Sequence, residues 1–588
     1  MKQSVVLNKT VCGFEDQKLI LSVVVFFLVG FAIFLFGKRV VFPDTAFDTV
    51  NYHFFLGKSG FENFPRMFKS SEFFPLGMHS FNPLLDTANY LVNEMLGYRF
   101  GTLLSLLSLI GSFILSIGIV FRVTQSRLTI IAAIFIFPAL IVNEGLFQVA
   151  TYFTDNHYTF LALNYVYILM GIGNEESSKA FVLRLFYLGI LGGLLITKLT
   201  NVIYIIPLCL ATIYLSLPRL EKLLNDEGEK ATFFLAIFSF LLPVLILPGI
   251  YLFDAFQHTG NPVFPYYNSI FKAIYFPYES WQFNFGPKTL FERIIYPYIA
   301  LADPIRLGEV KDLFPDVKLL TTFAFTVVAS VALFFFKAQL VEKEKALLFV
   351  TFVSFFIWQA LFGYTRYAIA LEIMLGLLLV ILVNRLMMLQ YRMYALIIIL
   401  PCFMFSLWKS IDIIKFNKIY DIAWRPLDIS YLDWKSRFFS RDMLKKTTSY
   451  DALLAKKLVE VDVVVQCVNP SSVYSKTFPE LENKPMLNFD KKSNGSMTSN
   501  ENYINQRDLS ALRALGKVGV EALSFAIVLN NTNKGMHSLT ICFDALETER
   551  KHGRLLSVEE KIVVDNFVGD ARQQLLVFLG KYHMPQKD

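Results

Sequence analysis

The chain has 588 residues, of which 55% are hydrophobic and only 18% are charged, and it contains 60 Phe and 27 Tyr. A soluble domain usually has about 25% charged residues, and it cannot hide this much apolar surface without large exposed patches. The composition therefore excludes a simple soluble enzyme and a disordered chain, and it predicts a polytopic membrane protein.

The charges are unevenly distributed along the chain. Residues 1–411 carry 30 Lys/Arg and 26 Asp/Glu, whereas residues 412–588 carry 25 and 22. The first part is about 14% charged and the second about 27%, which is close to the soluble norm. We therefore expect a membrane module at 1–411 followed by a soluble domain at 412–588. The net charge of +7 is modest and gives no reason to expect a nucleic-acid partner.

Eleven segments are candidate membrane helices, each of which needs about 20 apolar residues to cross a bilayer. They are 19–37, 100–121, 128–142, 157–173, 181–197, 201–217, 231–250, 319–336, 346–362, 367–384 and 394–411, and the third and fourth are short. Basic residues gather in alternate short loops, which predicts a cytoplasmic N-terminus. With eleven spans, the 412–588 domain then lies outside the membrane.

Two long exterior loops follow from this topology, at 38–99 and 251–318. Both are rich in aromatic residues and proline. Such segments can lie as amphipathic stretches at the membrane interface, where aromatic rings prefer to sit. Alternatively, they form a roof over a cavity just outside the membrane.

Ionisable residues gather on the predicted exterior side. Asp44 and Asp48 lie in the first loop, followed by Tyr52 and His53, and Asp155 and His157 lie at the exterior end of the fourth span. One carboxylate can take the proton of an acceptor hydroxyl, and a second can position the reactants or bind a divalent metal ion such as Mg²⁺, Mn²⁺ or Zn²⁺. The metal would lie on Asp48 and Asp155. The alternative is that either Asp44 or Asp48 caps a helix and that Asp155 caps the fourth span.

Several short motifs carry a resemblance to a known family. They are DTVNYH at 48–53, QVATYFTD at 148–155, GGLLITKLT at 192–200, TGNPVFPY at 259–266 and GYTRY at 363–367. In this order they resemble the GT-C glycosyltransferases of bacteria, which include protein O-mannosyltransferases and the aminoarabinose transferases of lipid A. The resemblance covers about 20–411 and does not include the C-terminal domain.

The resemblance implies a GT-C-like helical fold and an inverting sugar transfer from a polyprenyl-phosphate donor in a bacterial cytoplasmic membrane. Asp48 is the favoured general base because it carries the Tyr-His context, with Asp44 as the alternative, and Asp155 is the second catalytic carboxylate. Arg366 and Lys198 would bind the donor phosphate, for which Arg offers a bidentate fork and Lys a point charge. For Lys198, the alternative is a side chain that only reaches the membrane interface. The remaining residues implied to bind substrate are Asp44, Tyr52, His53, His157, Asn261, Tyr266 and Tyr367.

The sequence predicts a small α/β or α+β fold for the C-terminal domain. The pattern predicts helices at 449–459 and 505–515, strands at 461–465, 522–529 and 537–544, and one or two helices within 557–582. Cys467 and Cys542 could pair in an oxidising compartment, or both could be free and buried. The expected role of the domain is to select the acceptor or to stabilise the roof.

Two other functions are compatible with a membrane protein of this size. A transporter or flippase of a lipid-linked glycan would place charges near the middle of the membrane and often contains internal repeats, which this chain does not show. An O-antigen ligase or polymerase also uses large exterior loops, but the DTVNYH motif argues against it. The acceptor can be a glycan, a lipid or a protein.

If the chain is a glycosyltransferase of this kind, the carboxyl groups of Asp48 and Asp155 lie within about 10 Å of each other.

Overall fold

The structure, a computed structural model, describes the membrane module at 14–40, 53–62, 82–125, 128–173, 177–264, 266–273, 289–303 and 318–389. In the C-terminal part it describes 452–466, 478–481, 486–488, 522–530, 555–568 and 571–583, and a few single positions lie between these ranges. Asp44, Asp48, Tyr52 and both predicted partners Cys467 and Cys542 lie outside the described residues. The predicted distance between Asp48 and Asp155 is therefore not tested.

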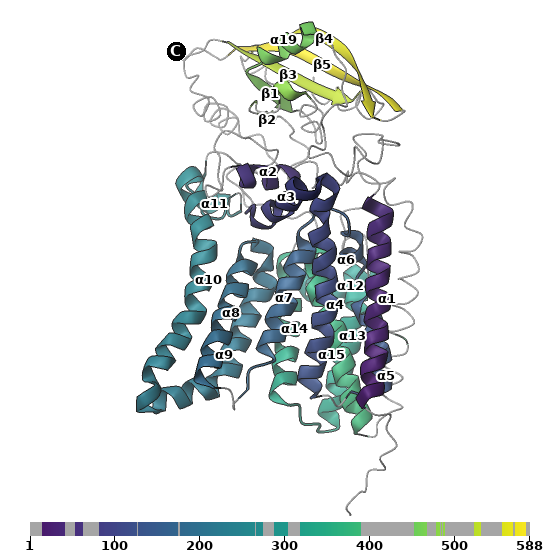
Figure 1. The fold of residues 1–588 in the computed structure, drawn as a ribbon, viewed down its shortest axis with the longest axis vertical. Coiled ribbons are helices and arrows are strands. Elements are labelled where there is room, and N and C mark those ends of the chain that lie inside the picture. The colour runs from purple at the N-terminus through teal and green to yellow at the C-terminus, as the bar shows by residue number, and fades with distance from the viewer. Residues whose placement is uncertain are drawn as a thin grey trace, which may run out of the picture.

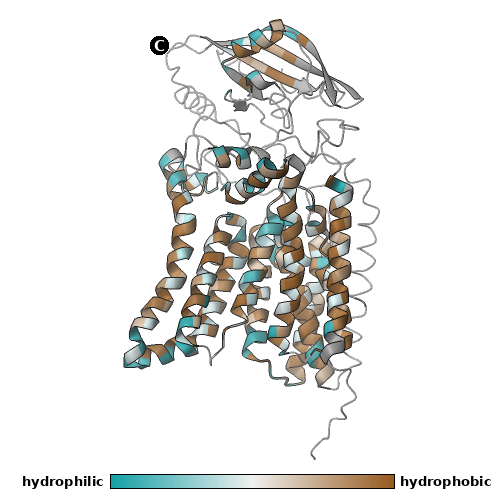
Figure 2. Ribbon diagram, viewed as in Figure 1, coloured by the Kyte–Doolittle hydropathy of each residue, from teal (hydrophilic) through white to brown (hydrophobic). Residues whose placement is uncertain are grey.

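The membrane module is a bundle of helices that run up and down through one apolar layer (Figures 1 and 2). Its long helices are α1 (Phe14–Val40), α4 (Leu103–Thr124), α8 (Ser178–Ile196), α9 (Val202–Asn225), α10 (Lys230–Thr259), α13 (Lys318–Phe335), α14 (Glu342–Leu361) and α15 (Ile369–Met388). Within the described residues, eight helical stretches are long and apolar enough to cross a membrane. The chain is therefore a multi-pass membrane protein by length and composition.

The third and fourth predicted spans are helices, but they are shorter than a membrane crossing normally requires. They form α5 (Ile130–Leu140) and α7 (Asp155–Leu169), which pack inside the bundle. The eleventh predicted span, 394–411, lies almost entirely outside the described residues. The expectation of eleven spans is therefore supported for eight, and two more are short internal helices.

One boundary prediction was wrong. The second long loop was expected to begin at residue 251, but α10 continues to Thr259. No Pro or Gly lies between Tyr251 and Thr259, and the helix ends at Gly260, whose φ of 73° suits a residue without a side chain.

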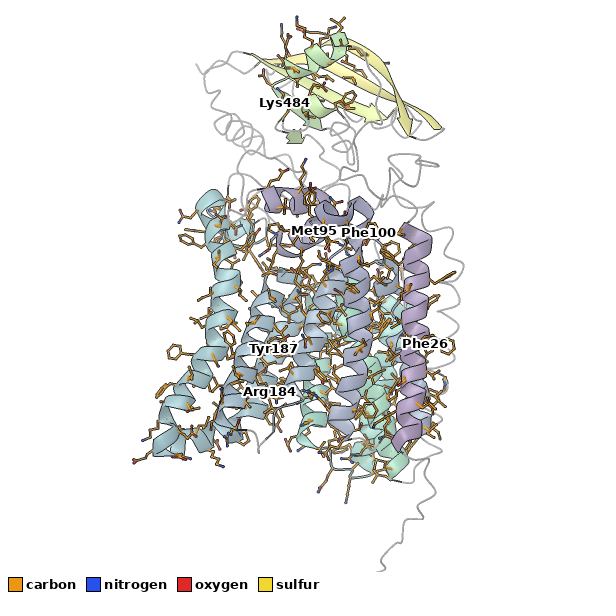
Figure 3. All side chains as sticks on the ribbon, in the orientation of Figure 1. Phe26, Met95, Phe100, Arg184, Tyr187 and Lys484 are labelled. Atoms are coloured by element: carbon orange, nitrogen blue, oxygen red, sulfur yellow. The ribbon has the colours of Figure 1, made fainter. Side chains whose placement is uncertain are left out.

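Burial distinguishes the central helix from the peripheral ones. In the most apolar 18-residue stretch of the helix that contains α15, 94% of the residues are buried, whereas in the corresponding stretch of α10 only 11% are. Small residues allow close contacts between helices: a Cβ atom at Gly193 of α8 would lie 2.5 Å from the carbonyl oxygen of Pro243 in α10. Bulky side chains point outwards instead, such as Phe26 of α1, which is 74% exposed (Figure 3).

Short helices cover one end of the bundle, which we call the roof end. They are α2 (Phe54–Glu62), α3 (Leu84–Leu96) and α11 (Asn268–Phe271), and the C-terminal sheet lies beyond them (Figure 1). Two further short helices are α6 (Asn143–Phe147) and α12 (Leu290–Ala302). Because α7 and α15 begin at the roof end and α8 ends there, the polar residues at these three termini are brought together.

The C-terminal part contains α19 (Ala452–Val459) and a five-stranded mixed sheet in the order β2-β1-β3-β5-β4. The strands are β1 (Val463–Gln466), β2 (Met486–Asn488), β3 (Ala522–Asn530), β4 (Leu555–Val568) and β5 (Ala571–His583). β1 is parallel to β2 and β3, whereas β5 is antiparallel to β3 and β4. The predicted helix at 449–459 and the strands at 461–465 and 522–529 match this structure.

The prediction of helices within 557–582 was wrong, because this region forms the β4–β5 hairpin. Val558, Ile562, Val563 and Val564 are β-branched and favour an extended backbone. The two strands pair along almost their whole length, from Leu555 opposite His583 to Val568 opposite Ala571. The backbone hydrogen bonds of each strand are made with the other strand, so they cannot be predicted from the periodicity of one segment alone. The predicted helix at 505–515 and strand at 537–544 lie outside the described residues.

Candidate functional site

Asp155 is the meeting point of four chain segments at the roof end. It is the first residue of α7, and only 6% of its surface is exposed. Its Oδ1 accepts a hydrogen bond from Lys198, which follows α8, and its Oδ2 accepts from Arg366 Nε at 3.0 Å, just before α15. Gln148, after α6, donates to Oδ2 at 3.2 Å. One buried carboxylate therefore holds two cations and an amide in place.

The charges around Asp155 keep it ionised. Burial alone raises the pKa of this carboxyl, but Lys198 and Arg366 outweigh burial and hold the pKa well below its usual range. Counted by themselves, these three side chains carry one net positive charge. Lys198 and Arg366 are therefore suited to interact with an anion at the roof end of the bundle.

Aromatic rings fix the positions of both cations. The Lys198 ammonium lies 5.4 Å from the ring centre of Tyr158 and 5.6 Å from that of Tyr367, and the Arg366 guanidinium lies 4.3 Å from the ring of Phe153. These are cation–π distances. Tyr266 also lies near the site: burial raises the pKa of its phenol, and Arg366 acts in the opposite direction. The cations are therefore held in an aromatic cage.

Helix α3 turns its polar side inwards and its apolar side outwards. Asp86, Asn89 and Asn93 are buried, whereas Leu91 and Met95 are exposed, Met95 by 71% (Figure 3). A helix of a soluble domain shows the reverse pattern. The inward polar stripe implies that α3 covers a polar site while its outer face meets lipid or another apolar surface.

The buried face of α3 holds both histidines that the sequence singled out. His53 Nδ1 lies 2.6 Å from Asp86 Oδ1, and His157 Nε2 lies 2.9 Å from Asn89 Oδ1. Burial raises the pKa of Asp86, against the opposing effect of His53 and, at longer range, Lys198. α3 thereby joins the segment before α2 to the first turn of α7.

The contact of α2 with α3 depends on a glycine. A Cβ atom at Gly57 would lie 2.5 Å from the carbonyl oxygen of Asp86. We expect Gly57→Ala to lower the free energy of unfolding by about 1–3 kcal/mol, because it overpacks a closed contact. Thermal unfolding of the detergent-solubilised protein measures this effect. Gly30→Ala on α1 is the matched control, since a Cβ there meets nothing within 4 Å; equal melting temperatures for the two variants would contradict the assignment.

The segment between α5 and α7 is anchored by basic side chains of two helices, α1 and α13. Arg39 of α1 donates to the carbonyl oxygens of Leu146, Phe147 and Val149, the first at 2.6 Å. Lys318 of α13 donates to the carbonyl oxygen of Ile141 and forms a buried ion pair of 2.9 Å with Glu372 of α15. Ala150 has a φ of 65°, which is strained for a residue with a side chain. These anchors hold Gln148 against Asp155.

The predicted site residues are brought together to different degrees. Asp155, Lys198 and Arg366 form one hydrogen-bonded group, and Tyr367 and Tyr266 lie beside it. Asn261 is fully buried, but its amide organises its own loop, donating to the carbonyl oxygen of Tyr266 at 2.9 Å and accepting from Val263 N at 3.0 Å. In the structure Asn261 therefore stabilises its own loop and is not accessible to a substrate.

Sequence reasoning missed Asp86, Asn89, Lys318 and Glu372. The spacing of Asp86, Asn89 and Asn93 would have placed them on one helical face, which was a usable sign of a polar inner stripe. Lys318 lies directly before the eighth predicted span, where charged residues are common, so nothing local distinguished it. Glu372 is the sixth residue of the tenth predicted span, where a carboxylate is costly, and this was a second usable sign.

The predicted divalent-metal role fits Asp155 poorly. Both of its oxygens are engaged by donors, and two cations already lie against it. Across the residues that the structure describes, no group of three His, Cys, Asp or Glu side chains could hold a metal ion. Asp48, the other predicted metal ligand, lies outside these residues.

Comparisons with solved structures place this architecture in a known class. ArnT from Cupriavidus metallidurans in the apo state matches with a TM-score of 0.50 and 14% identity, over 94% of this chain and 97% of that one. The same enzyme bound to undecaprenyl phosphate matches with a TM-score of 0.47 and 12% identity over the same shares. The Archaeoglobus fulgidus oligosaccharyltransferase, in complex with Zn and sulfate, gives 0.42 and 12% over 86% of this chain and 67% of that one. Neither a protein-family model nor a curated protein sequence matches the chain.

The first of these matches shows the fold over nearly the whole length of both chains. The chain is therefore structurally similar to the GT-C membrane glycosyltransferases, and the resemblance predicted from the short motifs is confirmed at the level of the fold. At this identity the similarity does not identify the substrate.

Proposed function

We propose that the protein is an inverting membrane glycosyltransferase that moves a sugar from a polyprenyl phosphate to an acceptor outside a bacterial cytoplasmic membrane. The observation that carries this proposal is the group formed by Asp155, Lys198 and Arg366, buried at the roof end of a GT-C fold. Two cations at the roof end suit a phosphate whose isoprenoid tail stays between the membrane helices.

The chemistry needs a site for the leaving phosphate and an acceptor for one proton. The acceptor hydroxyl oxygen attacks the anomeric carbon while the bond from this carbon to the phosphate oxygen breaks. The polyprenyl phosphate leaves as an anion, and preorganised cations lower the barrier by stabilising the developing charge. Lys198 and Arg366 are proposed to supply these charges.

The two carboxylates have different parts in this scheme. Asp155 is a poor proton acceptor, because its charge is stabilised by Lys198, Arg366 and Gln148. We assign it the positioning of the two cations. Asp48 takes the proton of the acceptor hydroxyl as the general base, and Asp44 and Tyr52 of the same loop, with His53, help to orient the substrates.

Arg366 provides a test of the phosphate site. Arg366→Ala should weaken donor binding by about 10- to 150-fold, since a charge-assisted hydrogen bond contributes about 1.5–3 kcal/mol. Arg366→Lys should weaken it less, because the charge is kept and the planar fork is lost. Binding of a labelled polyprenyl-phosphate sugar in detergent measures both effects.

The matched control is Arg385→Ala. Arg385 also pairs with a buried carboxylate, Glu344 at 3.3 Å, but at the end of α15 away from the roof. Donor affinity should be unchanged in this variant. Equal affinities of Arg366→Ala and wild type would remove Arg366 from the phosphate site.

The substrate is best found by direct assay. Membranes that contain the protein should transfer label from one member of a panel of polyprenyl-phosphate sugars to a glycan, lipid or protein acceptor. Membranes with Asp48→Asn should not. If no donor of the panel is consumed above the level of control membranes, the proposed function is wrong.

A further inference from the structure

Three polar atoms in the surroundings of Asp155 are buried and have no hydrogen-bond partner among the described residues: Nδ2 of Asn89, Oε1 of Gln148 and Nδ1 of His157. Gln148 contacts Asp155 directly, and Asn89 is linked to this region through His157. Asn89 and Gln148 have no exposed surface, and His157 is 6% exposed. Buried polar groups are nearly always satisfied by protein, water or ligand. Three unsatisfied groups around one carboxylate therefore point to a polar ligand.

Each of the three side chains is fixed by a bond on its other polar atom. Gln148 donates its amide nitrogen to Asp155, which as a carboxylate can only accept, so Oε1 is the atom left over. Asn89 and His157 hydrogen-bond to each other at 2.9 Å. The His157 ring is close enough to Asp155, His53 and Lys198 to be affected by their charges, so the group adjoins the site described above.

The leftover atoms form a mixed, neutral set. If His157 donates from Nε2 to the Asn89 oxygen, Nδ1 remains as an acceptor and the Asn89 amide as a donor. In the other arrangement, the Asn89 amide donates to His157 Nε2. Nδ1 of His157 then carries the hydrogen and is a free donor, and the Asn89 oxygen is a free acceptor. In either arrangement the pair offers one donor and one acceptor. Gln148 adds a further acceptor. Hydroxyl groups, which donate and accept at once, match this set, whereas a phosphate requires donors and cations.

We propose that Asn89, Gln148 and His157 form a subsite for the hydroxyl groups of the donor sugar, next to the cations that hold the donor phosphate. This inference rests on the proposed function and adds to it a division of the donor site. Lys198 and Arg366 bind the charged phosphate, and the neutral trio recognises the sugar. α3 is then part of the specificity-determining surface, since Asn89 comes from its buried face.

The test compares ligands with and without the sugar, and it allows for the charge of the phosphate, because bare undecaprenyl phosphate is a monoester with up to one more negative charge than the sugar-linked diesters. Undecaprenyl phosphate and a set of undecaprenyl-phosphate-linked hexoses and pentoses are bound in competition to the purified full-length protein. The readout is the preference of each variant relative to that of the wild type, where preference means the affinity for a sugar-bearing lipid divided by the affinity for the bare lipid. In Asn89→Leu and in His157→Phe this preference should fall about tenfold, while the affinity for bare undecaprenyl phosphate stays within about twofold, because a tenfold change corresponds to the loss of one good hydrogen bond.

Asn384→Leu is the matched control. Asn384 is a buried asparagine on α15 whose side-chain oxygen accepts from Thr129 N at 3.1 Å, away from the roof end. Its loss lowers stability in the same way without touching the trio, so the sugar preference should be kept. Thermal unfolding of all variants confirms that folded protein is compared.

The outcomes separate the subsite from the proposed function. If both variants keep the preference of the wild type, the trio is not a sugar subsite. In that case the binding of undecaprenyl phosphate itself would still support the phosphate site. If undecaprenyl phosphate does not bind at all, the proposed function fails first.

Discussion

Asp155→Asn is expected to lower the rate of sugar transfer by about 10²–10³-fold, the range seen when a preorganised charge-stabilising group is removed. The amide keeps the shape of the side chain but leaves Lys198 and Arg366 without their shared counter-charge. Breaking a buried ion pair by removing one partner is also destabilising, by about 3–5 kcal/mol. Single-turnover transfer at saturating donor, together with thermal unfolding, separates the loss of rate from the loss of folded protein.

The matched control for this variant is Asp226→Asn. The carboxylate of Asp226 also accepts a hydrogen bond, from Gly228 N at 3.0 Å, but in an exposed turn between α9 and α10. Its substitution should leave transfer unchanged. A rate close to that of wild type in folded Asp155→Asn would mean that the cations do not need this carboxylate.

The low pKa of Asp155 has a consequence for pH dependence. A carboxyl whose folded-state pKa is depressed adds stability above its unfolded pKa of about 3.9, and loses this stability as the pH falls through the lower folded value. Since Lys198 and Arg366 hold Asp155 in this state, its contribution is constant at neutral pH. A fall in activity between pH 5 and about 7 must then come from another group, such as the general base.

Asp48→Asn is expected to lower transfer by about 10²–10⁴-fold, the range for loss of a general base. The substitution keeps the size of the side chain and removes the proton acceptor. Lipid-donor binding should be retained, because the cations that hold the phosphate are untouched. Rapid-quench measurements of a single turnover, with donor affinity measured in parallel, show whether the defect lies in the chemical step.

Asp44→Asn, measured beside it, decides between the two carboxylates of the first loop. If Asp48 is the base, Asp44→Asn should retain most of the rate. If Asp44→Asn is the more damaging variant and Asp48→Asn turns over almost normally, the role of base passes to Asp44.

Much of the fold and part of the site follow from the sequence because they depend on strong local patterns. Apolar stretches of about 20 residues predict membrane helices whatever their neighbours are. Lys198 and Arg366 stand out as basic residues at span ends that otherwise carry few. Asp155 stands out as a carboxylate at the start of a short span.

The relations between these residues could not be predicted in the same way. Both cations were assigned to a phosphate, but in the structure both bind Asp155, which depends on how α7, α8 and α15 pack. The inward polar face of α3 reverses the usual amphipathic pattern, so Asp86 and Asn89 were not singled out within the predicted loop 38–99. The β4–β5 hairpin depends on pairing between strands, which local helical periodicity does not report.

The most direct test of the central claim is single-turnover sugar transfer by the purified protein in detergent, where no membrane remains to be crossed. The proposed transferase should release polyprenyl phosphate and form a glycosylated acceptor under these conditions, and this product should be lost in Arg366→Ala and Asp48→Asn. A flippase would instead move the lipid-linked glycan across liposomes. Absence of transfer with every donor and acceptor tried, together with translocation in liposomes, would contradict the claim.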